Sequence, residues 1–562
     1  MSDDLLNQLL LARGIETPEQ REKFLTPGYL RDISDPFLLR DMERAVARIL
    51  LAVKNLEKII IFSDYDADGV PGAFVLSEFV KKINYTNLEV YIPNRHTESY
   101  GLSEKSISEF AENGAKLVIT IDCGITDVTE VKLANKLNLD VIITDHHLPP
   151  AVLPEAYAII NPEQIDDEYP DKMLCGSGVI FKVVQALIKS GGFEIDKNWE
   201  KTLLDLVAIA TISDRVPLTE ENRALTKFGL IMLQRTRRPG LMALLAAAKL
   251  RQENLNEDDV GFMLGPRINS AGRMSHASEA FFLLTTNNIS EAQEMAKHLE
   301  KQNAERKKSV EKIMETCEAR LGAIPEADLP AVIVIGDESW SPGVLGLGAS
   351  RLVENRYQRP VFVWGSNGDE IKGSCRSDGS VNLVDLMREA DLPAEASAKA
   401  EGFFTAFGGH AMAGGFAISL EKVGELEARL LKAYKKIEKI KKPEQVEPDA
   451  VISIDDVSEY AWHLLEQLAP FGTGNPKPVF SLPNIEIAQA KTFGNGGIHL
   501  ELGFAKSNGT IVCAIGFFTA LDKFKNVKLE VGNRINLTAT LEKSYFKRQP
   551  ELRLRIVEIT PA

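Results

Sequence analysis

The chain has 562 residues, 44% of them hydrophobic, and a formal net charge of -15. This length and apolar content predict three or more domains with their own cores, and no apolar run is long enough for a membrane span. The negative charge argues on its face against a nucleic-acid partner. Net charge averages over a whole surface whereas binding uses local patches, so it excludes only a uniformly basic protein.

The cysteines and the start of the chain indicate the compartment. Five scattered cysteines with no CxxC pair predict free thiols in a reducing environment. The acidic segment Met1–Asp4 is unlike a signal peptide. We therefore expect a cytoplasmic protein that does not associate with membranes.

Residues 1–45 are predicted to form short helices. Four leucines between Leu5 and Leu10 make an apolar face, and Thr17–Gln20 has the composition of a helix start. We expect this segment to pack on the sheet of the following domain and to take no part in chemistry.

The first chemical motif follows an apolar run. Ile59–Phe62 has the composition of a buried parallel strand, and Asp64, Asp66, Asp68 and Gly69 come directly after it. Carboxylates this close cost free energy unless a cation neutralises them, and the carboxyl end of a strand is where an open α/β sheet places its ligands. Taken alone, the motif also fits a calcium-binding or a solvated turn.

The same arrangement, an apolar element that ends in Asp or His, occurs three more times. These elements are Leu117–Ile121 before Asp122, Val141–Thr144 before Asp145, His146 and His147, and a helical run at Leu206–Ile212 before Asp214. A single Asp at a strand end is usually a cap or turn residue. Four such ends together predict one shared site.

The ligand types indicate the metal and the reaction. Carboxylates and imidazoles without a cysteine cluster suit Mn²⁺ or Mg²⁺ better than structural zinc. Two such ions about 4 Å apart, bridged by a shared carboxylate, would clamp a phosphoryl group. The predicted chemistry is hydrolysis by an activated water.

The four motifs resemble motifs one to four of the DHH phosphoesterase superfamily. Nearly the whole chain is similar to the branch of that superfamily formed by bacterial single-strand-specific exonucleases. The resemblance implies five metal ligands, Asp64, Asp66, Asp122, His146 and Asp214, with Asp122 bridging. It also implies that His147 faces the scissile phosphate as a sixth catalytic residue, and that Asp68 and Asp145 orient the ligands.

Four further segments match the same branch and imply substrate contacts. They are the loop Pro93–Leu102 with Arg95, the segment Gly265–Met274 with Arg267, Asn269 and Arg273, the segment Gly373–Ser377 with Ser374 and Arg376, and the segment Gly408–Gly415 with His410. The alternatives are a solvated arginine at the first, arginines paired with core acids at the second, and a structural histidine at the last.

The predicted architecture has five regions. An α/β, doubly wound and mostly parallel DHH catalytic domain at residues 46–285 follows the helical residues 1–45. A long helix from Ser290, its expected cap, to Leu321, ended by Gly322, occupies the connecting residues 286–325. A smaller α/β domain resembling DHHA1 spans 326–436, and 437–562 forms a linker and a β-rich OB-fold.

The C-terminal region has the properties of a strand-binding module. The Pro-marked segment Pro443–Pro448 predicts a linker, and the short strands after it suit an OB-fold. Residues 481–562 carry 11 Lys and Arg against 7 Asp and Glu, which is a local positive excess. Tyr545–Arg548 is predicted to be an exposed loop that stacks on bases.

Three positions depart from the pattern of the family. Ser63 stands where a glycine is usual, Val70–Gly72 replaces a hydroxyl-rich stretch, and Ser341 replaces a histidine. The first two leave the predicted ligands intact. The third puts one substrate contact of the second lobe in doubt.

The resemblance implies a metal-dependent exonuclease that degrades single-stranded DNA from the 5′ end in recombination and repair. It also implies a monomer that works with a single-strand-binding protein and a recombination helicase. One alternative is a phosphoesterase of short oligonucleotides or small nucleotides. The other is a catalytically dead DNA-binding scaffold, like the inactive replicative-helicase subunits of the superfamily.

Overall fold

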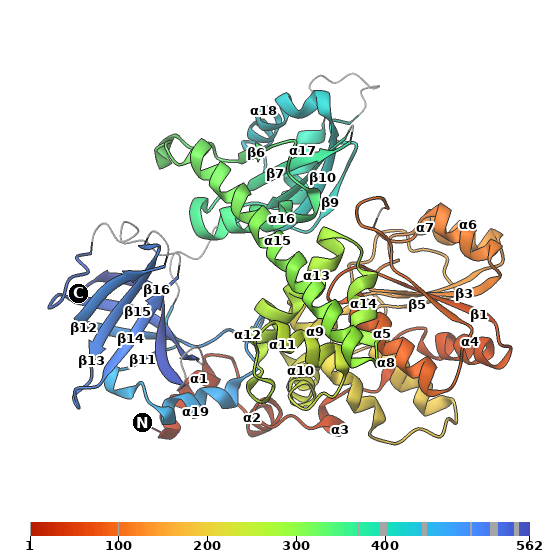
Figure 1. Cartoon of the computed structure of the whole chain (residues 1–562), viewed down its shortest axis with the longest axis horizontal. Coiled ribbons are helices and arrows are strands. Elements are labelled where there is room, and N and C mark those ends of the chain that lie inside the picture. Colours follow the sequence, from red (N-terminus) through yellow and green to blue (C-terminus); the bar gives the residue numbers. More distant parts are fainter. Residues whose placement is uncertain are drawn as a thin grey trace.

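The computed structural model describes residues 2–98, 100–368, 370–392, 402–440, 447–494, 497–517, 527–544 and 550–562. The chain forms three parts that each contain a sheet, and one long helix joins the first two of them (Figure 1). Among the described residues, no helix combines the length and apolar content that crossing a bilayer requires.

The first part is built on a five-stranded sheet in the order β2-β1-β3-β4-β5. All of its neighbouring strands run parallel. The strands are β1 (Lys58–Ser63), β2 (Leu88–Tyr91), β3 (Ala115–Ile121), β4 (Asp140–Thr144) and β5 (Ala158–Ile160). The carboxyl ends of these strands therefore meet at one edge, where an open α/β sheet binds its ligands.

Helices cover both faces of this sheet, which confirms the doubly wound fold. Ile59 and Ile61 point into a core shared with helices on one face, whereas Ile60 and Phe62 point into a second core on the other face. The first face carries α4 (Met42–Lys54), α5 (Gly69–Lys82), α8 (Gly176–Ser190) and α9 (Leu204–Ser213), and the second carries α6 (Glu104–Glu112) and α7 (Val128–Lys136).

A helical region extends this part toward the second one. It comprises α10 (Glu220–Leu233), α11 (Pro239–Ala247), α12 (Glu257–Asp259), the π-helical turn η4 (Val260–Leu264), α13 (Gly265–Met274), α14 (Ser278–Thr285) and the 33-residue α15 (Ile289–Leu321). The predicted cap of α15 is wrong by two residues, because the Asn288 side chain accepts from the backbone N–H groups of Ser290 and Glu291.

The second part is a mixed sheet in the order β6-β7-β8-β10-β9. Its elements are β6 (Ile333–Gly336), α16 (Pro342–Leu352), β7 (Val361–Asn367), β8 (Glu370–Arg376), α17 (Leu383–Asp391), β9 (Ala406–Gly409), β10 (Ala413–Ser419) and α18 (Val423–Tyr434). Val310, Ile313 and Cys317 of α15 are buried in one core with Val344 and Leu345 of α16. The long helix therefore contributes to the core of the second part.

The third part is a five-stranded barrel closed by pairing of β12 with β15 and extended by β11. Its elements are β11 (Ala450–Val451), α19 (Glu459–Leu468), β12 (Val479–Phe493), β13 (His499–Ala505), β14 (Ile511–Gly516), β15 (Arg534–Ser544) and β16 (Glu551–Pro561). Most of the expected linker Pro443–Pro448 and the loop Tyr545–Arg548 lie outside the described residues.

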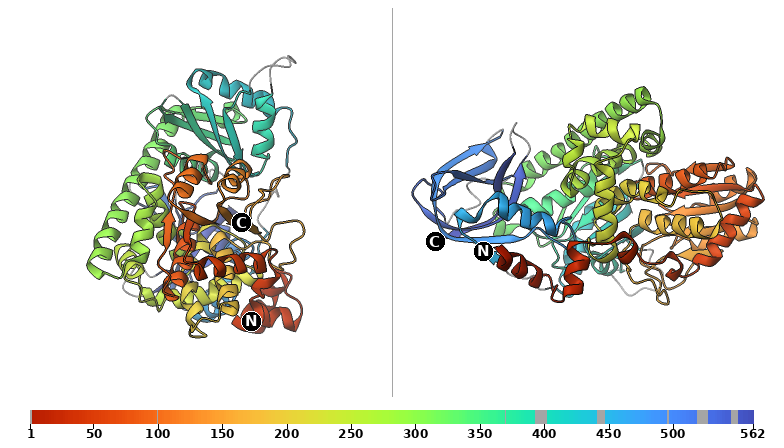
Figure 2. Two further views of the ribbon diagram at one scale, coloured as in Figure 1. Left: turned by 90° about the vertical axis from the view of Figure 1, so that its right-hand side faces the viewer. Right: turned by 90° about the horizontal axis from the view of Figure 1, so that it is seen from below.

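The first two N-terminal helices pack on this barrel, not on the first sheet as predicted. The remainder of residues 1–45 does pack on the core of the first part, in which Leu39 and Met42 are buried and against which Tyr29 packs. α1 (Ser2–Leu11) places Leu9 and Leu10 at 0% and 1% exposure in the core of the barrel, and Phe24 and Leu25 of α2 (Pro18–Leu25) pack against it. Figure 2 shows these helices beside the barrel. The apolar face of α1 is therefore covered by strands more than 400 residues away in the sequence.

Two arginines reinforce this junction. Arg223 of α10 lies over the Phe24 ring and donates to the carbonyl oxygens of Phe24 and Ala469. Its burial lowers the pKa of Arg223 to about 9. Arg13 donates to Asn475 Oδ1 and to the carbonyl oxygen of Pro476.

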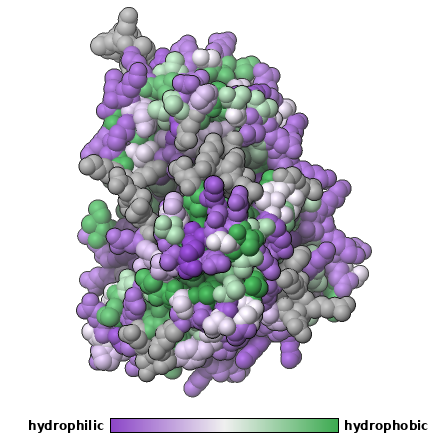
Figure 3. Space-filling view, turned by 90° about the vertical axis from the view of Figure 1, so that its left-hand side faces the viewer, coloured by the Kyte–Doolittle hydropathy of each residue, from purple (hydrophilic) through white to green (hydrophobic). Residues whose placement is uncertain are grey.

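Viewed from the barrel side, apolar side chains gather in a band across the lower half of a largely hydrophilic face (Figure 3).

Truncating Leu10 should destabilise the barrel. Leu10→Ala removes a side chain that is 1% exposed, and such truncations cost about 2–5 kcal/mol. Leu11→Ala is the matched control on the same helix because Leu11 is 54% exposed, and it should change stability by less than about 0.5 kcal/mol. Amide exchange of the β12 and β15 strands measures the difference. Equal exchange rates in the two variants would contradict the packing of α1 in the barrel core.

Candidate metal centre

The loop after β1 is held in a tight turn that presents its aspartates. The Asp66 Oδ1 atom accepts from the backbone N–H groups of Asp68 and Gly69, which fixes the start of α5. A Cβ atom at Gly69 would lie 2.5 Å from the carbonyl oxygen of Asp64, so only glycine fits there. Ser63, the first departure from the family pattern, donates to the same carbonyl oxygen and leaves the Asp64 side chain unobstructed.

Asp122 adopts an uncommon backbone conformation at the end of β3. Its φ angle is 63°, in the left-handed region. The backbone N–H of Asp122 donates to the carbonyl of Thr144, and Gly176 packs so closely that an added Cβ would lie 2.5 Å from Asp122 Cβ. Local strain of this kind occurs where the surrounding structure holds a residue for function.

Asp145 organises the two histidines after β4. Its carboxylate accepts from the backbone N–H groups of Ile125, His146 and His147, and from the Nδ1 of His147 at 2.7 Å. Burial opposes ionisation, but these hydrogen bonds prevail and lower the pKa of Asp145. Burial also opposes the charge on His147, yet its bond to Asp145 raises the pKa of His147 to about 9. The position of Asp145 agrees with the predicted orienting role.

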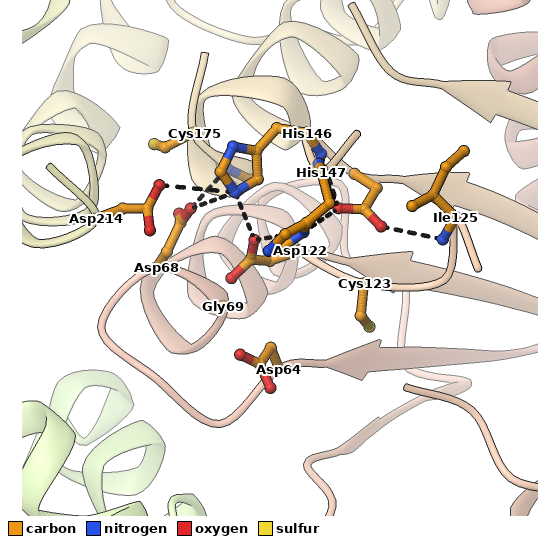
Figure 4. A network of polar contacts seen from close by, with 12 residues as sticks. Asp64, Asp68, Gly69, Asp122, Cys123, Ile125, His146, His147, Cys175 and Asp214 are labelled. Atoms are coloured by element: carbon orange, nitrogen blue, oxygen red, sulfur yellow. Dashed lines mark hydrogen bonds and ion pairs between the residues drawn. The ribbon is translucent and has the colours of Figure 1, made fainter. Parts of the chain in front are cut away.

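These elements converge on His146, which lies at the centre of the cluster (Figure 4). Its Nε2 atom is 3.1 Å from Asp122 Oδ1, 3.6 Å from Asp214 Oδ2 and 3.8 Å from Asp68 Oδ2. Three sets of residues have ligand atoms within 4.8 Å of one another. They are Asp64, Asp66 and Asp122; Asp68, His146 and Asp214; and Asp122, His146 and His147. The structure thus brings together all six predicted catalytic residues.

The carboxylates of the cluster resist ionisation without a cation. Burial, followed by the neighbouring Asp68, Asp66 and Asp64, raises the pKa of Asp122 well above its ordinary value. Burial and Asp66 do the same for Asp64, and burial with Asp68 and Asp66 raises the pKa of Asp214 to about 9. This is the electrostatic state expected of like charges gathered in a site of low dielectric constant.

The residues present fit a divalent-cation site. Asp64 Oδ1, Asp122 Oδ1 and His146 Nε2 are buried atoms without a hydrogen-bond partner. Buried polar atoms are normally satisfied, and these three point into the cluster that Figure 4 shows. Burial lowers the pKa of His146, which favours the neutral imidazole that binds metals. Asp68, which we predicted only to orient ligands, lies close enough to be a ligand itself.

Residues of the second part face the cluster. The ring of His410, between β9 and β10, lies 6.4 Å from the ring of His147 with an interplanar angle of 13°.

Tyr100, in the first part, also contacts the cluster, although we did not select it from the sequence. Its hydroxyl donates to the carbonyl of Asp122 and lies 3.4 Å from His147 Nδ1. The residue belongs to the loop Pro93–Leu102, which we selected only for Arg95.

Several arginines gather beside the cluster. Arg95 lies 4.1 Å above the ring of Tyr65, and Arg273 of α13 donates to the carbonyl of Gly343 at the start of α16. Burial, then the charges of Arg95 and Arg306, lowers the pKa of Arg273 to about 9. Arg376 also lies near Arg273 and donates to Ser350 Oγ. A Cβ atom at Gly346 would lie 3.0 Å from Arg376 and 3.5 Å from Ser374 Oγ, so these two side chains lie close together beside Gly346.

Two residues of the Gly265–Met274 segment have other contacts. The segment is the helix α13, and Arg267 is buried in an ion pair with Glu300 of α15. The structure therefore does not bring Arg267 to the cluster, which corrects the expectation of a substrate contact. Asn269 accepts from the backbone N–H of Ala67, so it supports the aspartate loop. Both partners come from distant parts of the sequence.

Matches to protein-family models cover the three parts of the chain. Residues 58–211 match the DHH family, N-terminal domain, residues 329–436 match the DHHA1 domain, and residues 448–558 match the RecJ OB domain. Together with the ligand cluster, these domains place the chain in the DHH class of proteins.

Relatives and solved structures narrow this class. The chain is 37% identical over 518 residues to the single-stranded-DNA-specific exonuclease RecJ of Bacillus subtilis, covering 91% of this chain and 63% of that protein. It is 33% identical to the Escherichia coli RecJ, covering 85% and 82%. A crystal structure of Thermus thermophilus RecJ with Mn²⁺ superposes with a TM-score of 0.81 at 26% identity, covering 99% of this chain and 76% of that one. The chain belongs to the RecJ family.

The matched part of this chain covers 63% of the length of the Bacillus subtilis relative, which is less than two thirds. A second Thermus thermophilus RecJ structure contains Mg²⁺ and has a TM-score of 0.75 at 25% identity. Both ions are hard cations that take carboxylate and imidazole ligands, as the cluster of this chain offers.

The pKa of Asp214 leads to a test of the site by pH. The pKa of Asp214 rises from 3.8 to about 9 on folding, so between these values folding of the metal-free protein must take up a proton, and its stability falls as the pH rises. Metal-free Asp214→Asn should therefore melt about 5 °C above the wild type at pH 8, and the difference should shrink toward pH 5.

Mn²⁺ should raise the melting temperature of the wild type at pH 8 and should raise that of Asp214→Asn much less. Asp166→Asn is the control because the Asp166 side chain is 81% exposed, and it should match the wild type at each pH with and without Mn²⁺. Scanning calorimetry in EDTA or Mn²⁺ measures both effects. A melting difference that does not change with pH would argue against like-charge repulsion at Asp214.

Proposed function

We propose that this chain is a metal-dependent exonuclease that hydrolyses single-stranded DNA from the 5′ end, in recombination and repair. One observation carries the proposal. Three ligand atoms of a buried Asp and His cluster have no hydrogen-bond partner, and several arginines gather beside that cluster. The cluster suits a pair of cations and the arginines suit a phosphate, as phosphodiester hydrolysis requires.

The residues have distinct proposed roles in this reaction. Asp64, Asp66, Asp122, His146 and Asp214 would hold two Mn²⁺ or Mg²⁺ ions, which when bound supply Lewis-acid activation of water and neutralise phosphate charge. His147, kept protonated on Nδ1 by Asp145, would donate a hydrogen bond to the substrate phosphate. Asp145 and Tyr100 would keep this imidazole in orientation.

The 5′ polarity is attributed to the arginine pocket. Arg273, Arg376 and Ser374 come from both parts of the chain and lie beside the metal cluster. A terminal 5′ phosphate carries more charge than an internal one and would gain more from buried guanidinium groups. A strand seated there by its 5′ end presents its first phosphodiester bond to the cluster.

The two alternatives have specific observations against them. A phosphoesterase of small nucleotides needs no module that binds a strand, yet the barrel region is attached to the catalytic part by Arg223 and by the ion pair of Asp258 with Lys477. A catalytically dead scaffold would not need to retain Asp64, Asp122 and His146 in a strained and electrostatically costly arrangement. We therefore favour the exonuclease.

The physical context of the enzyme is part of the same proposal. We infer that the protein is cytoplasmic, because its five cysteines are all free and four are buried, and we infer from the family resemblance that it is a monomer. We also infer that a single-strand-binding protein and a recombination helicase supply its strands. Pull-down from a cytoplasmic extract with purified forms of these partners is the direct check.

Time-resolved digestion of a single strand labelled at either end tests the activity. The wild type with Mn²⁺ should release the 5′ label first as a mononucleotide, and EDTA should stop the reaction. Asp122→Asn should lower the rate by about 10³-fold or more, because it removes a ligand shared by both ions, while Asp166→Asn should digest at the wild-type rate. Release of the 3′ label first would overturn the polarity. A rate of Asp122→Asn near that of the wild type would overturn the metal assignment.

The polarity pocket is tested separately through Arg376. Arg376→Ala removes a buried guanidinium, and charge-assisted hydrogen bonds of this kind are worth about 1.5–3 kcal/mol. The preference in kcat/KM for a 5′-phosphorylated strand over a 5′-hydroxyl strand should therefore fall about tenfold or more. Arg388→Ala is the control, because Arg388 is exposed and pairs with Asp385 in the same part of the chain. An unchanged preference in Arg376→Ala would place the phosphate pocket elsewhere.

A further inference from the structure

The most exposed Phe, Tyr or Trp side chain among the described residues is Phe262, at 74%. A single exposed apolar residue is common and means little by itself. Phe262 is different because of where its backbone lies. It occupies the middle of η4, a π-helical turn of the kind that is rare and is found frequently at functional sites.

One side of this turn lies against the metal centre. A Cβ atom at Gly261 would be 3.5 Å from Ile212, and one at Gly265 would be 2.4 Å from Ser213 Oγ. Ile212 and Ser213 directly precede the ligand Asp214. The backbone around Phe262 is therefore fixed on the residues that hold Asp214 in place.

The other side of the same segment is attached to the barrel region. Asp258 of α12 forms an ion pair with Lys477, two residues before β12, and the Glu257 carboxylate accepts from the backbone N–H of Phe471. Figure 1 shows α12 on the side of the catalytic part that faces the barrel. The segment α12–η4 thus extends from the barrel to the catalytic centre, and Phe262 projects from it into solvent.

The barrel carries aromatic rings and cations near this segment. Arg555 of β16 lies 4.1 Å above the ring of Phe517, and the rings of Phe493 and His499 are 4.9 Å apart and close to Phe517. Arg555 is near enough to Asp258 for that carboxylate to raise its pKa, against the larger lowering by burial. A surface suited to bases and phosphates therefore begins where α12 meets the barrel.

We propose that Phe262 is a base-stacking platform that supports the strand between the barrel and the metal centre. The inference rests on the proposed function, since it assigns a contact to the same substrate. The charges near Phe262 favour a contact with bases over a contact with phosphates. Glu257, Asp258 and Asp259 precede Phe262 and repel phosphates. Every base has a face that can stack on an aromatic ring, whatever the sequence of the strand.

Substitutions at position 262 separate stacking from simple apolar contact. We compare KM for a strand of about 20 nucleotides with KM for a trinucleotide. In Phe262→Ala and Phe262→Leu the ratio of the two values, long strand over trinucleotide, should rise about tenfold. Phe262→Trp should have the wild-type ratio, because its ring can still stack. Phe282→Ala is the matched control, because Phe282 is 57% exposed on α14, and it should leave both KM values unchanged. The slope of KM with salt concentration should be the same in all variants, since no phosphate contact is lost.

A strand with one abasic site, moved position by position, completes the test. At one position the abasic site should weaken the binding of the wild type about tenfold. At that position it should not weaken the binding of Phe262→Ala any further, because effects of two changes at one direct contact are not additive. Additive effects at every position, or a normal KM ratio in Phe262→Leu, would overturn the inference. If the wild type fails to digest strands, the proposed function fails, and the abasic scan by binding alone still decides the role of Phe262.

Discussion

The structure depends on one electrostatic constraint, the burial of several carboxylates within a few ångströms of one another. Asp64, Asp122 and Asp214 cannot all be ionised there unless cations compensate them, and without cations they hold their protons more tightly, so the pKa values of all three are raised. A parallel sheet makes the gathering possible because β1, β3 and β4 end at the same edge. The repulsion among the carboxylates destabilises the metal-free state. A divalent ion that relieves this repulsion therefore binds more tightly.

Much of the surrounding structure keeps these charges in position. Asn269 holds the aspartate loop, and Gly176 lets the backbone approach Asp122. Asp145 accepts four hydrogen bonds, two of which come from His147 and fix it. Beside the carboxylates, Arg273 has Arg95, Arg306 and Arg376 as neighbours as well as Asp66. Carboxylates and guanidinium groups therefore lie side by side. The phosphate ester of the proposed function, bound together with its metal ions, would interact favourably with both.

The sequence was most informative where a local pattern determined the structure. Each apolar run that we predicted as a strand of the first sheet is one, because its residues alternate between two buried cores, and polar residues after such runs must meet at one edge. The long helix α15 was predictable from the helical spacing of its apolar residues. Its N-terminal cap was not predictable, because both Asn288 and Ser290 have side chains suited to capping.

Long-range partners could not be predicted from a single sequence. Nothing near Arg267 indicates that it pairs with Glu300, and nothing near Leu9 and Leu10 indicates that a distant barrel will cover them. Tyr100 and Phe262 were missed for a related reason. An aromatic residue has the same local signature whether it is buried, lies beside a ligand or projects into solvent.

The packing of α1 against the barrel also has a consequence for biosynthesis. Leu9 and Leu10 are synthesised more than 400 residues before the strands that cover them. At about 5–20 residues per second, the apolar face of α1 waits roughly half a minute or longer for its partner. The sheet with the metal ligands can fold during that interval. The barrel cannot complete its core until its own strands have been made, so a nascent chain would acquire its cluster of predicted metal ligands before its barrel.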